Sequence, residues 1–103
     1  MLLEMIREDY LKMTGVELPI SGGLGNSIED PIKINESDPA KSAYWISEVV
    51  GFIAMMTGEK IELVQSAIIR QGEKTIEQYK IAKDSDPDGY YNYYFDISKS
   101  YGN

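Results

Sequence analysis

The stretch IELVQSAIIRQGEKTIEQYKIAK, residues 61–83, decides the fold because its apolar residues recur with a period of two. Alternation on both sides of Gly72 is typical of two β-strands, and residues 71–73 predict the hairpin turn between them, with glycine at positive φ. Residues 86–89, Asp-Pro-Asp-Gly, predict a second turn, after which residues 91–97 alternate again. The sequence therefore predicts a C-terminal antiparallel meander of three strands.

The first half of the chain has a helical period instead. In residues 2–13 apolar side chains recur every three or four positions, which predicts an amphipathic helix. Asp38 as N-cap, Pro39 as the first helical residue and Gly58 as the stop predict a second helix between them. Residues 43–57 also fit a buried strand, because an apolar run alone does not separate the two structures.

The connecting segments complete the expected fold. Residues 16–30 lack periodicity and predict a loop, whereas residues 31–34 predict a short strand whose Pro31 favours an edge of the sheet. Gly51, in the middle of the second helix, indicates close packing on the sheet. We expect a single domain, residues 1–103, of the α+β class, with two helices packed on an antiparallel sheet in the order α-β-α-β-β-β.

The amino-acid composition and net charge argue against several classes of function. The 103 residues include no Cys and no His, which removes disulfides, thiolate chemistry, the commonest general base and the commonest metal ligand. The net charge of −7 argues against binding to nucleic acid. The first residues, interrupted by Glu4, Arg7, Glu8 and Asp9, lack the apolar stretch of a signal peptide, and the longest weakly polar run, Val49 to Thr57, is about half the length of a membrane span. We therefore expect a cytoplasmic protein that is not an enzyme, uses no cofactor and binds neither nucleic acid nor membranes.

Three alternating carboxylates precede a glycine in the predicted second turn. Asp84, Asp86 and Asp88 followed by Gly89 match the first half of a calcium-binding loop. The second half does not match, because the twelfth position, where a bidentate Glu belongs, is Phe95. A solvated hairpin turn is the interpretation that we favour, and a metal site of the three aspartates is the alternative.

Glycine also gathers in the segment from Gly22 to Ser27. Glycine-rich loops present backbone amides to phosphate groups in many proteins. The spacing here fits neither the dinucleotide-binding nor the P-loop pattern. We favour a tight connection between the first helix and the first strand, with a ligand-binding loop as the alternative.

Tyrosine is the abundant aromatic residue, with 8 Tyr against 2 Phe and 1 Trp. In the last strand, alternation leaves Tyr90 and Tyr94 on the face away from the core, with Asp96 beside them. Exposed tyrosines next to carboxylates are typical of protein-binding surfaces, although sheet propensity alone also accounts for them. The same alternation sends three aromatic side chains into the core: Tyr91, Tyr93 and Phe95.

Two islands of the chain resemble segments of small, uncharacterised bacterial proteins. The first reads Gly22-Gly23-x-Gly25-x-Ser27-x-Glu29-x-Pro31-Ile32-x-Ile34, and the second reads Tyr94-Phe95-Asp96-Ile97-Ser98 followed by Gly102. The resemblance supports a sheet in the C-terminal part of the chain. It implies no activity and carries over no catalytic residues.

Charge and tyrosine together suggest a function in binding. Residues 1–58 hold nine acidic and four basic residues, so most of the acid excess lies there. The leading hypothesis is a protein-binding domain, an inhibitor or immunity-type partner of a basic protein, to which charge would steer it. The expected contacts are four acids and two anchoring tyrosines: Glu29, Asp30, Glu36, Asp38, Tyr90 and Tyr94.

Two other hypotheses stay open. One is a small-molecule or calcium-binding domain that uses the 22–27 loop or the 84–89 turn. The other is homo-oligomerisation through an edge strand, either residues 31–34 or the last strand of the meander.

Overall fold

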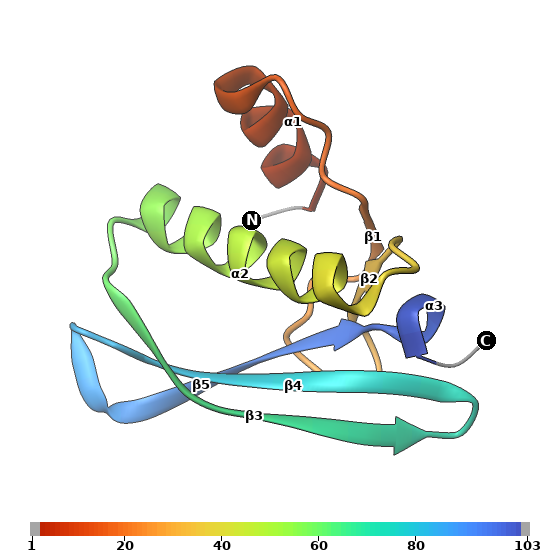
Figure 1. Ribbon diagram of the computed structural model, residues 1–103. Coiled ribbons are helices and arrows are strands. Elements are labelled where there is room, and N and C mark those ends of the chain that lie inside the picture. The colour runs from red at the N-terminus through yellow and green to blue at the C-terminus, as the bar shows by residue number, and fades with distance from the viewer. Residues whose placement is uncertain (1–2, 102–103) are drawn as a thin grey trace.

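The computed structural model describes residues 3–101, which form an α+β domain with three helices and a five-stranded mixed sheet. Leu2 of the expected first helix and Gly102 of the resemblance lie outside the described residues. Figure 1 shows the two long helices above the same face of the sheet. The helices are α1 (Leu3–Thr14), α2 (Pro39–Thr57) and α3 (Ser98–Tyr101). The strands are β1 (Ile20–Gly22), β2 (Ile32–Ile34), β3 (Ile61–Gln71), β4 (Lys74–Lys83) and β5 (Asp86–Asp96).

The C-terminal strands form the expected meander, but the sheet is not wholly antiparallel. Its order is β1-β2-β5-β4-β3, and β2 runs parallel to β5, with Ile32 beside Phe95. β2 therefore lies between two strands, and the expectation that residues 31–34 form an edge was wrong. Pro31 precedes the first paired residue, Ile32, so its missing N–H removes no bond of the ladder, and its carbonyl accepts a hydrogen bond from Gly23 N–H at 3.0 Å.

The structure contains two short elements that the sequence pattern did not indicate. β1 lies within the segment expected to be a loop and pairs antiparallel with β2 over three residues. A strand of this length shows at most one alternation, so it has no periodic signal of its own. The second element is α3, a short helix of four residues that follows β5.

The second helix is a helix throughout, which excludes the buried-strand alternative for residues 43–57. The Asp38 carboxylate accepts a hydrogen bond from Ala40 N–H at 2.9 Å, and Gly58 ends the helix at a φ of 72°. The prediction that Gly51 packs closely on the sheet was wrong. Nothing lies within 4 Å of the position that a Cβ on Gly51 would occupy, because this residue is on the exposed side of α2.

One of the two predicted turns is displaced. Gly72 turns the β3–β4 hairpin with a φ of 62°, as predicted. The β4–β5 turn, however, is at Asp84 and Ser85, and residues 86–89 already belong to β5. Lys83 pairs with Asp86 while Ala82 pairs with Tyr90, so residues 87–89 have no partner in the register with β4. The Asp-Pro-Asp-Gly segment thus forms an irregular bulge rather than the turn itself.

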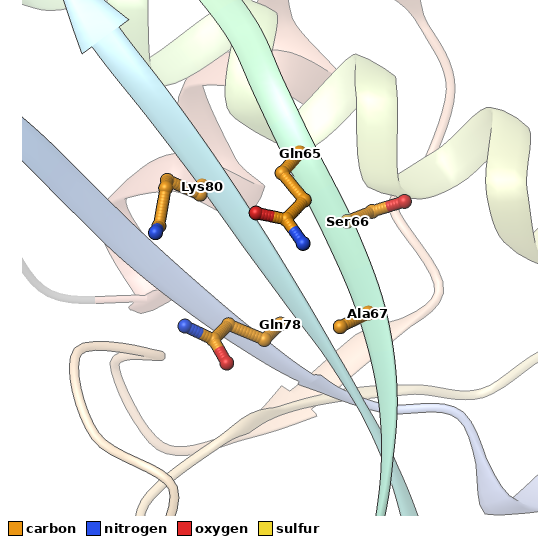
Figure 2. Close-up of a pocket in the computed structure, with 5 residues that line it drawn as sticks. All are labelled: Gln65, Ser66, Ala67, Gln78 and Lys80. Carbon is orange, nitrogen blue, oxygen red and sulfur yellow. The ribbon is translucent and has the colours of Figure 1, made fainter.

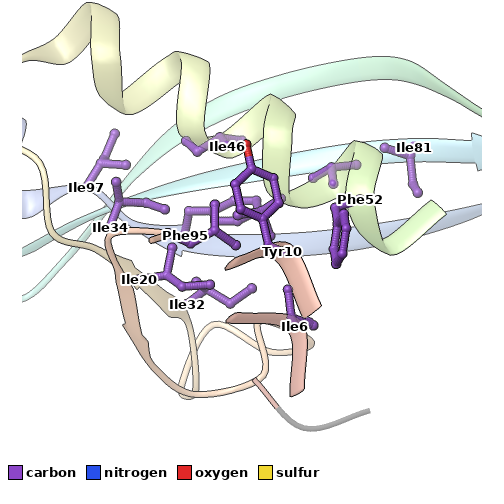
Figure 3. Close-up of a cluster of buried hydrophobic side chains, with 13 residues drawn as sticks. Ile6, Tyr10, Ile20, Ile32, Ile34, Ile46, Phe52, Ile81, Phe95 and Ile97 are labelled. Atoms are coloured by element: carbon purple, nitrogen blue, oxygen red, sulfur yellow. The ribbon is translucent and has the colours of Figure 1, made fainter. Parts of the chain in front are cut away.

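The hydrophobic core lies between α1, α2 and the sheet, as Figure 3 shows. Phe95, Ile32 and Ile34 of the sheet are fully buried there, together with Val49 of α2. Tyr93 is half-buried against this cluster, in keeping with its predicted direction.

Tyr91 departs from the prediction because 42% of it is exposed. β2 pairs with β5 only at Phe95 and Asp96, so the part of β5 that holds Tyr91 is a local edge with little to cover it. The Lys83 ammonium lies over the Tyr91 ring, 4.2 Å from its centroid.

Candidate functional site

The uncovered face of the sheet carries the two tyrosines that we predicted as anchors. The register places Tyr90 opposite Ala82 and Tyr94 opposite Gln78, so both tyrosines point away from Phe95 and the core. Tyr90 is 57% exposed, and the Lys80 ammonium lies 5.5 Å from its ring centroid. The tyrosines thus share a face with a lysine instead of with carboxylates.

Asp96 does not join this surface, contrary to our expectation. It is buried, and its carboxylate accepts hydrogen bonds from both the backbone N–H and the hydroxyl of Ser98. These bonds hold the first residue of α3 against the end of β5. Asp96 therefore has a structural role at the junction between the last strand and the last helix.

A shallow hollow of about 160 Å³ lies between β3 and β4. Figure 2 shows the amide groups of Gln65 and Gln78 and the Lys80 ammonium close together there. The Gln78 amide donates to the Asn92 side-chain oxygen at 3.0 Å, so part of this polar surface is already satisfied internally. The hollow is lined by no carboxylate, and its only ionisable side chain is that of Lys80.

The predicted acidic contacts do not form one patch with the tyrosines. Three of the four carboxylates accept hydrogen bonds from nearby backbone amides: Asp30 from Leu24, Glu36 from Asp38, and Asp38 from Ala40.

Only two of the predicted acids lie near a predicted tyrosine. The Gly25 carbonyl accepts a hydrogen bond from Tyr94 N–H at 2.8 Å, and Gly25 N–H donates to the Asp30 carbonyl, so the structure brings Asp30 and its neighbour Glu29 towards Tyr94. Tyr90 lies four residues earlier, roughly 13 Å along β5. Glu36 and Asp38 lie at the start of α2, near α3, where the Ser100 hydroxyl donates to the Glu36 carbonyl.

The glycine-rich loop is explained by close packing. A Cβ on Gly23 would lie 1.9 Å from the Asp30 carboxylate, and Gly25 has a φ of 77° with the Ile32 side chain 2.9 Å from its Cβ position. The amides that a phosphate would need are already used, since Gly23 N–H donates to the Pro31 carbonyl and Gly25 N–H to the Asp30 carbonyl. A hollow of about 380 Å³ does lie between this loop and α1.

The aspartate-rich segment gives the calcium interpretation no geometric support. Asp84 lies in the turn, where its N–H donates to the Lys60 carbonyl, while the Asp86 carboxylate folds back to 2.2 Å from the Cβ position of Gly89. Across the part of the chain that the structure describes, no three acidic side chains come together as metal ligands would.

The carboxylates that do gather are on α1, where the sequence interpretation did not place a site. Glu4 and Glu8 of α1, together with Glu17 just beyond it, surround Arg7 and the apolar Leu11 in an open hollow of about 360 Å³. Arg7 donates to Glu17 at 2.9 Å, which leaves the other two carboxylates exposed. We call these five residues the α1 surface. The concentration of acid in the first half of the chain was the signal for it.

Tyr10 holds α1 in place behind this surface. Its ring meets Phe52 of α2 edge-on at 5.3 Å, and its hydroxyl donates to the Glu48 carboxylate at 3.0 Å. Burial, and then the hydrogen bond to Glu48, raise the pKa of Tyr10. The nearby Glu48 charge is also the main cause of the raised pKa of Tyr44. Glu48 thus joins α1 to α2 while adding to the negative charge of the helical side.

Comparisons with known protein families, curated proteins and solved structures give no significant match to this chain. In residues 3–101, no helix has the length and apolar character needed to cross a membrane.

Proposed function

We propose that this chain is a non-catalytic protein-binding domain that docks a basic partner on the α1 surface. The observation that carries the proposal is the group of exposed carboxylates of Glu4, Glu8 and Glu17 around the exposed side chain of Leu11. A hydrophobic contact ringed by charge is the usual anatomy of a protein interface. The net charge of −7 adds a long-range attraction for a cationic partner.

The more specific proposal is that binding inhibits or neutralises that partner. An acidic domain that covers a cationic surface blocks any substrate that the surface would otherwise attract. The absence of His and Cys from the sequence supports a role in binding rather than in catalysis.

Paired charge variants test this proposal. The Glu4→Gln/Glu8→Gln variant neutralises two carboxylates of the α1 surface, and Asp84→Asn/Asp88→Asn removes the same charge from the β4–β5 turn and the bulge that follows it, as a matched control. Each variant and the natural chain are used to capture proteins from a lysate of the source cells at about 50 mM and about 500 mM salt. The captured protein is then produced pure and its affinity for all three chains is measured.

The expected result is one basic protein that is retained at low salt and released at high salt. Two exposed ion pairs are together worth about 1 kcal/mol, so the α1 variant should bind about fivefold more weakly than the natural chain, whereas the control should lose little. Equal losses in the two variants, or binding that does not depend on salt, would show that the α1 surface is not the docking site.

The small-ligand hypothesis has weaker support. The hollow beside the Gly22–Ser27 loop offers Arg7 to an anion, but the loop amides that should accompany it are bonded internally. The tyrosine face is likewise weaker as a site for a basic partner, because Lys80 lies over Tyr90.

A further inference from the structure

β3 is a long strand with one free edge. It spans 11 residues at the end of the sheet and pairs with β4 alone among the described strands, whereas the opposite end of the sheet is β1, of three residues. Every residue of β3 is exposed or half-exposed. Its outer N–H and C=O groups therefore form a template that another strand can pair with.

The free edge of β3 lacks most of the sequence features that keep edge strands from pairing with another chain. β3 contains no Pro and no Lys, and its only charged residues are Glu62 and Arg70, near opposite ends. Ile68 is 55% exposed, and Leu63 and Val64 are also exposed. The register with β4 shifts once, between Leu63 and Gln65, and is then regular to the end of the strand, so the bulge at Val64 interrupts only the first part of the edge.

We infer that β3 pairs antiparallel with β3 of a second copy of this chain, about a two-fold axis at Ser66. With the Val64 bulge kept, Ser66 then faces its own symmetry mate, and Gln65 faces Ala67 of the other copy. Leu63 comes opposite Ile68, and the β4 register directs both side chains to the helix side of the sheet. Because the axis is two-fold, each of these contacts occurs twice.

Charge and apolar contacts favour the Ser66-centred register over two alternative pairings of the β3 edges. The Ser66-centred pairing brings Glu62 of each copy to within one residue of Arg70 of the other. A parallel pairing in register would instead set Glu62 against Glu62 and Arg70 against Arg70. Moving the axis to Ala67 would place Leu63 opposite Arg70 and lose the apolar pair.

Charge also favours a second copy over a basic partner at this edge. The β3–β4 hairpin, residues 61–83, holds three acidic and four basic residues, so its net charge is +1 in a chain of net charge −7. Two copies repel each other least through this hairpin, and a cationic protein is not attracted to it. The paired edges would join the two sheets into one continuous sheet.

The absence of cysteine from the natural chain makes a crosslinking test clean. At the two-fold axis the Cα atoms of directly opposed residues are about 4.5–5.5 Å apart, within the range that a disulfide spans. Ser66→Cys is therefore expected to form a disulfide-linked dimer under mild oxidation. Ser85→Cys, in the exposed β4–β5 turn, is the control and should crosslink only slowly.

Sedimentation of the natural chain, which has no cysteine, gives an independent measurement of the dimer. The natural chain should reach twice its 11.6 kDa mass as concentration rises. Ile68→Lys should weaken the dimer at least about tenfold, whereas Met55→Lys, at a similarly exposed site on α2, should leave it unchanged. Glu62→Arg should weaken the dimer and Glu62→Arg/Arg70→Glu should restore it, with circular dichroism to confirm that each variant is folded.

A chain that stays monomeric at all concentrations would overturn the inference. So would a dimer that Ile68→Lys leaves intact, or one in which Ser66→Cys crosslinks no faster than Ser85→Cys. These outcomes do not depend on the α1 surface, so the inference and the proposed function can fail separately.

Discussion

Truncation of the aromatic side chains of β5 tests which of them the core includes. Phe95 is fully buried, pairs with Ile32 of β2 and Glu77 of β4, and lies 6.3 Å edge-on from the Tyr79 ring. Phe95→Ala should cost about 4 kcal/mol, from lost burial and the cavity left behind. Tyr93→Ala should cost about 2 kcal/mol because its ring is only half-buried, and Tyr91→Ala less than about 1 kcal/mol, chiefly its contact with Lys83.

The assay is urea unfolding followed by circular dichroism, with free energies taken from the midpoint and the slope. A domain of this size has a total stability of about 5–15 kcal/mol, so Phe95→Ala could leave too little folded protein to measure. Phe95→Leu, with a smaller expected cost of about 1–1.5 kcal/mol, is the variant to use in that case. If Tyr91→Ala costs as much as Phe95→Ala, Tyr91 is in the core and the placement of this end of β5 is wrong.

Three further predictions concern single positions and are checked by the same unfolding assay. Gly51→Ala should stabilise the domain by up to about 1 kcal/mol, because alanine favours the helix and nothing lies near its Cβ position. Gly23→Ala should destabilise the domain, because its Cβ would meet Asp30. Equal effects of the two substitutions would contradict this packing. Asp38→Ala should cost about 1 kcal/mol by removing the N-cap of α2, and Ser37→Ala, next to it, is the control expected to change little. Burial raises the pKa of Glu77 above 4.5, so the charged form weakens the fold once pH rises through that range. Glu77→Gln should therefore stabilise the protein at pH 7 and lose that advantage below about pH 4, and a pH-independent difference would show that the Glu77 charge is not the cause.

The parts of the fold that follow from the sequence are those decided by a few neighbouring residues. Asp38 caps α2, Gly58 ends it and Gly72 turns a hairpin, because each depends on the backbone conformation of one residue and on groups within one turn of it. The alternation in residues 61–83 likewise predicted two strands, since it extends over many residues.

The parts that do not follow depend on contacts between distant segments. The parallel pairing of β2 with β5 joins residues more than sixty positions apart, and nothing in residues 31–34 specifies its partner. Tyr91 lies before the point at which β2 begins to pair with β5, and that point is a property of another strand. Alternation alone treats Tyr91 and Phe95 as equivalent, because it gives the direction of a side chain and not the extent of what covers it.

Local hydrogen bonds, which the sequence pattern does not reveal, also explain why the predicted acidic contacts do not form one binding surface. Asp30, Glu36 and Asp38 are acidic residues of the kind that a basic partner would attract, but each also accepts hydrogen bonds from local amides, which composition alone cannot distinguish. Glu4 and Glu8 have no such bonds among the described contacts, and they lie with Glu17 only because the chain turns back after α1. The excess of acidic residues therefore indicated the first half of the chain as the place of a binding site, but it did not indicate the α1 surface within it.

The two proposed interactions should respond differently to salt. Docking of a basic partner on the α1 surface rests on attraction between opposite charges, so it should weaken as salt rises from about 50 to about 500 mM. Pairing of two β3 edges joins chains that each carry a charge of −7 through backbone hydrogen bonds and apolar contacts, so screening should leave that dimer unchanged or tighter. Sedimentation at the two salt concentrations separates the cases. Self-association that gives a broad series of oligomers and is lost at high salt would point instead to the weakly basic β3–β4 hairpin of one copy binding the α1 surface of the next, because a head-to-tail contact of this kind is open at both ends.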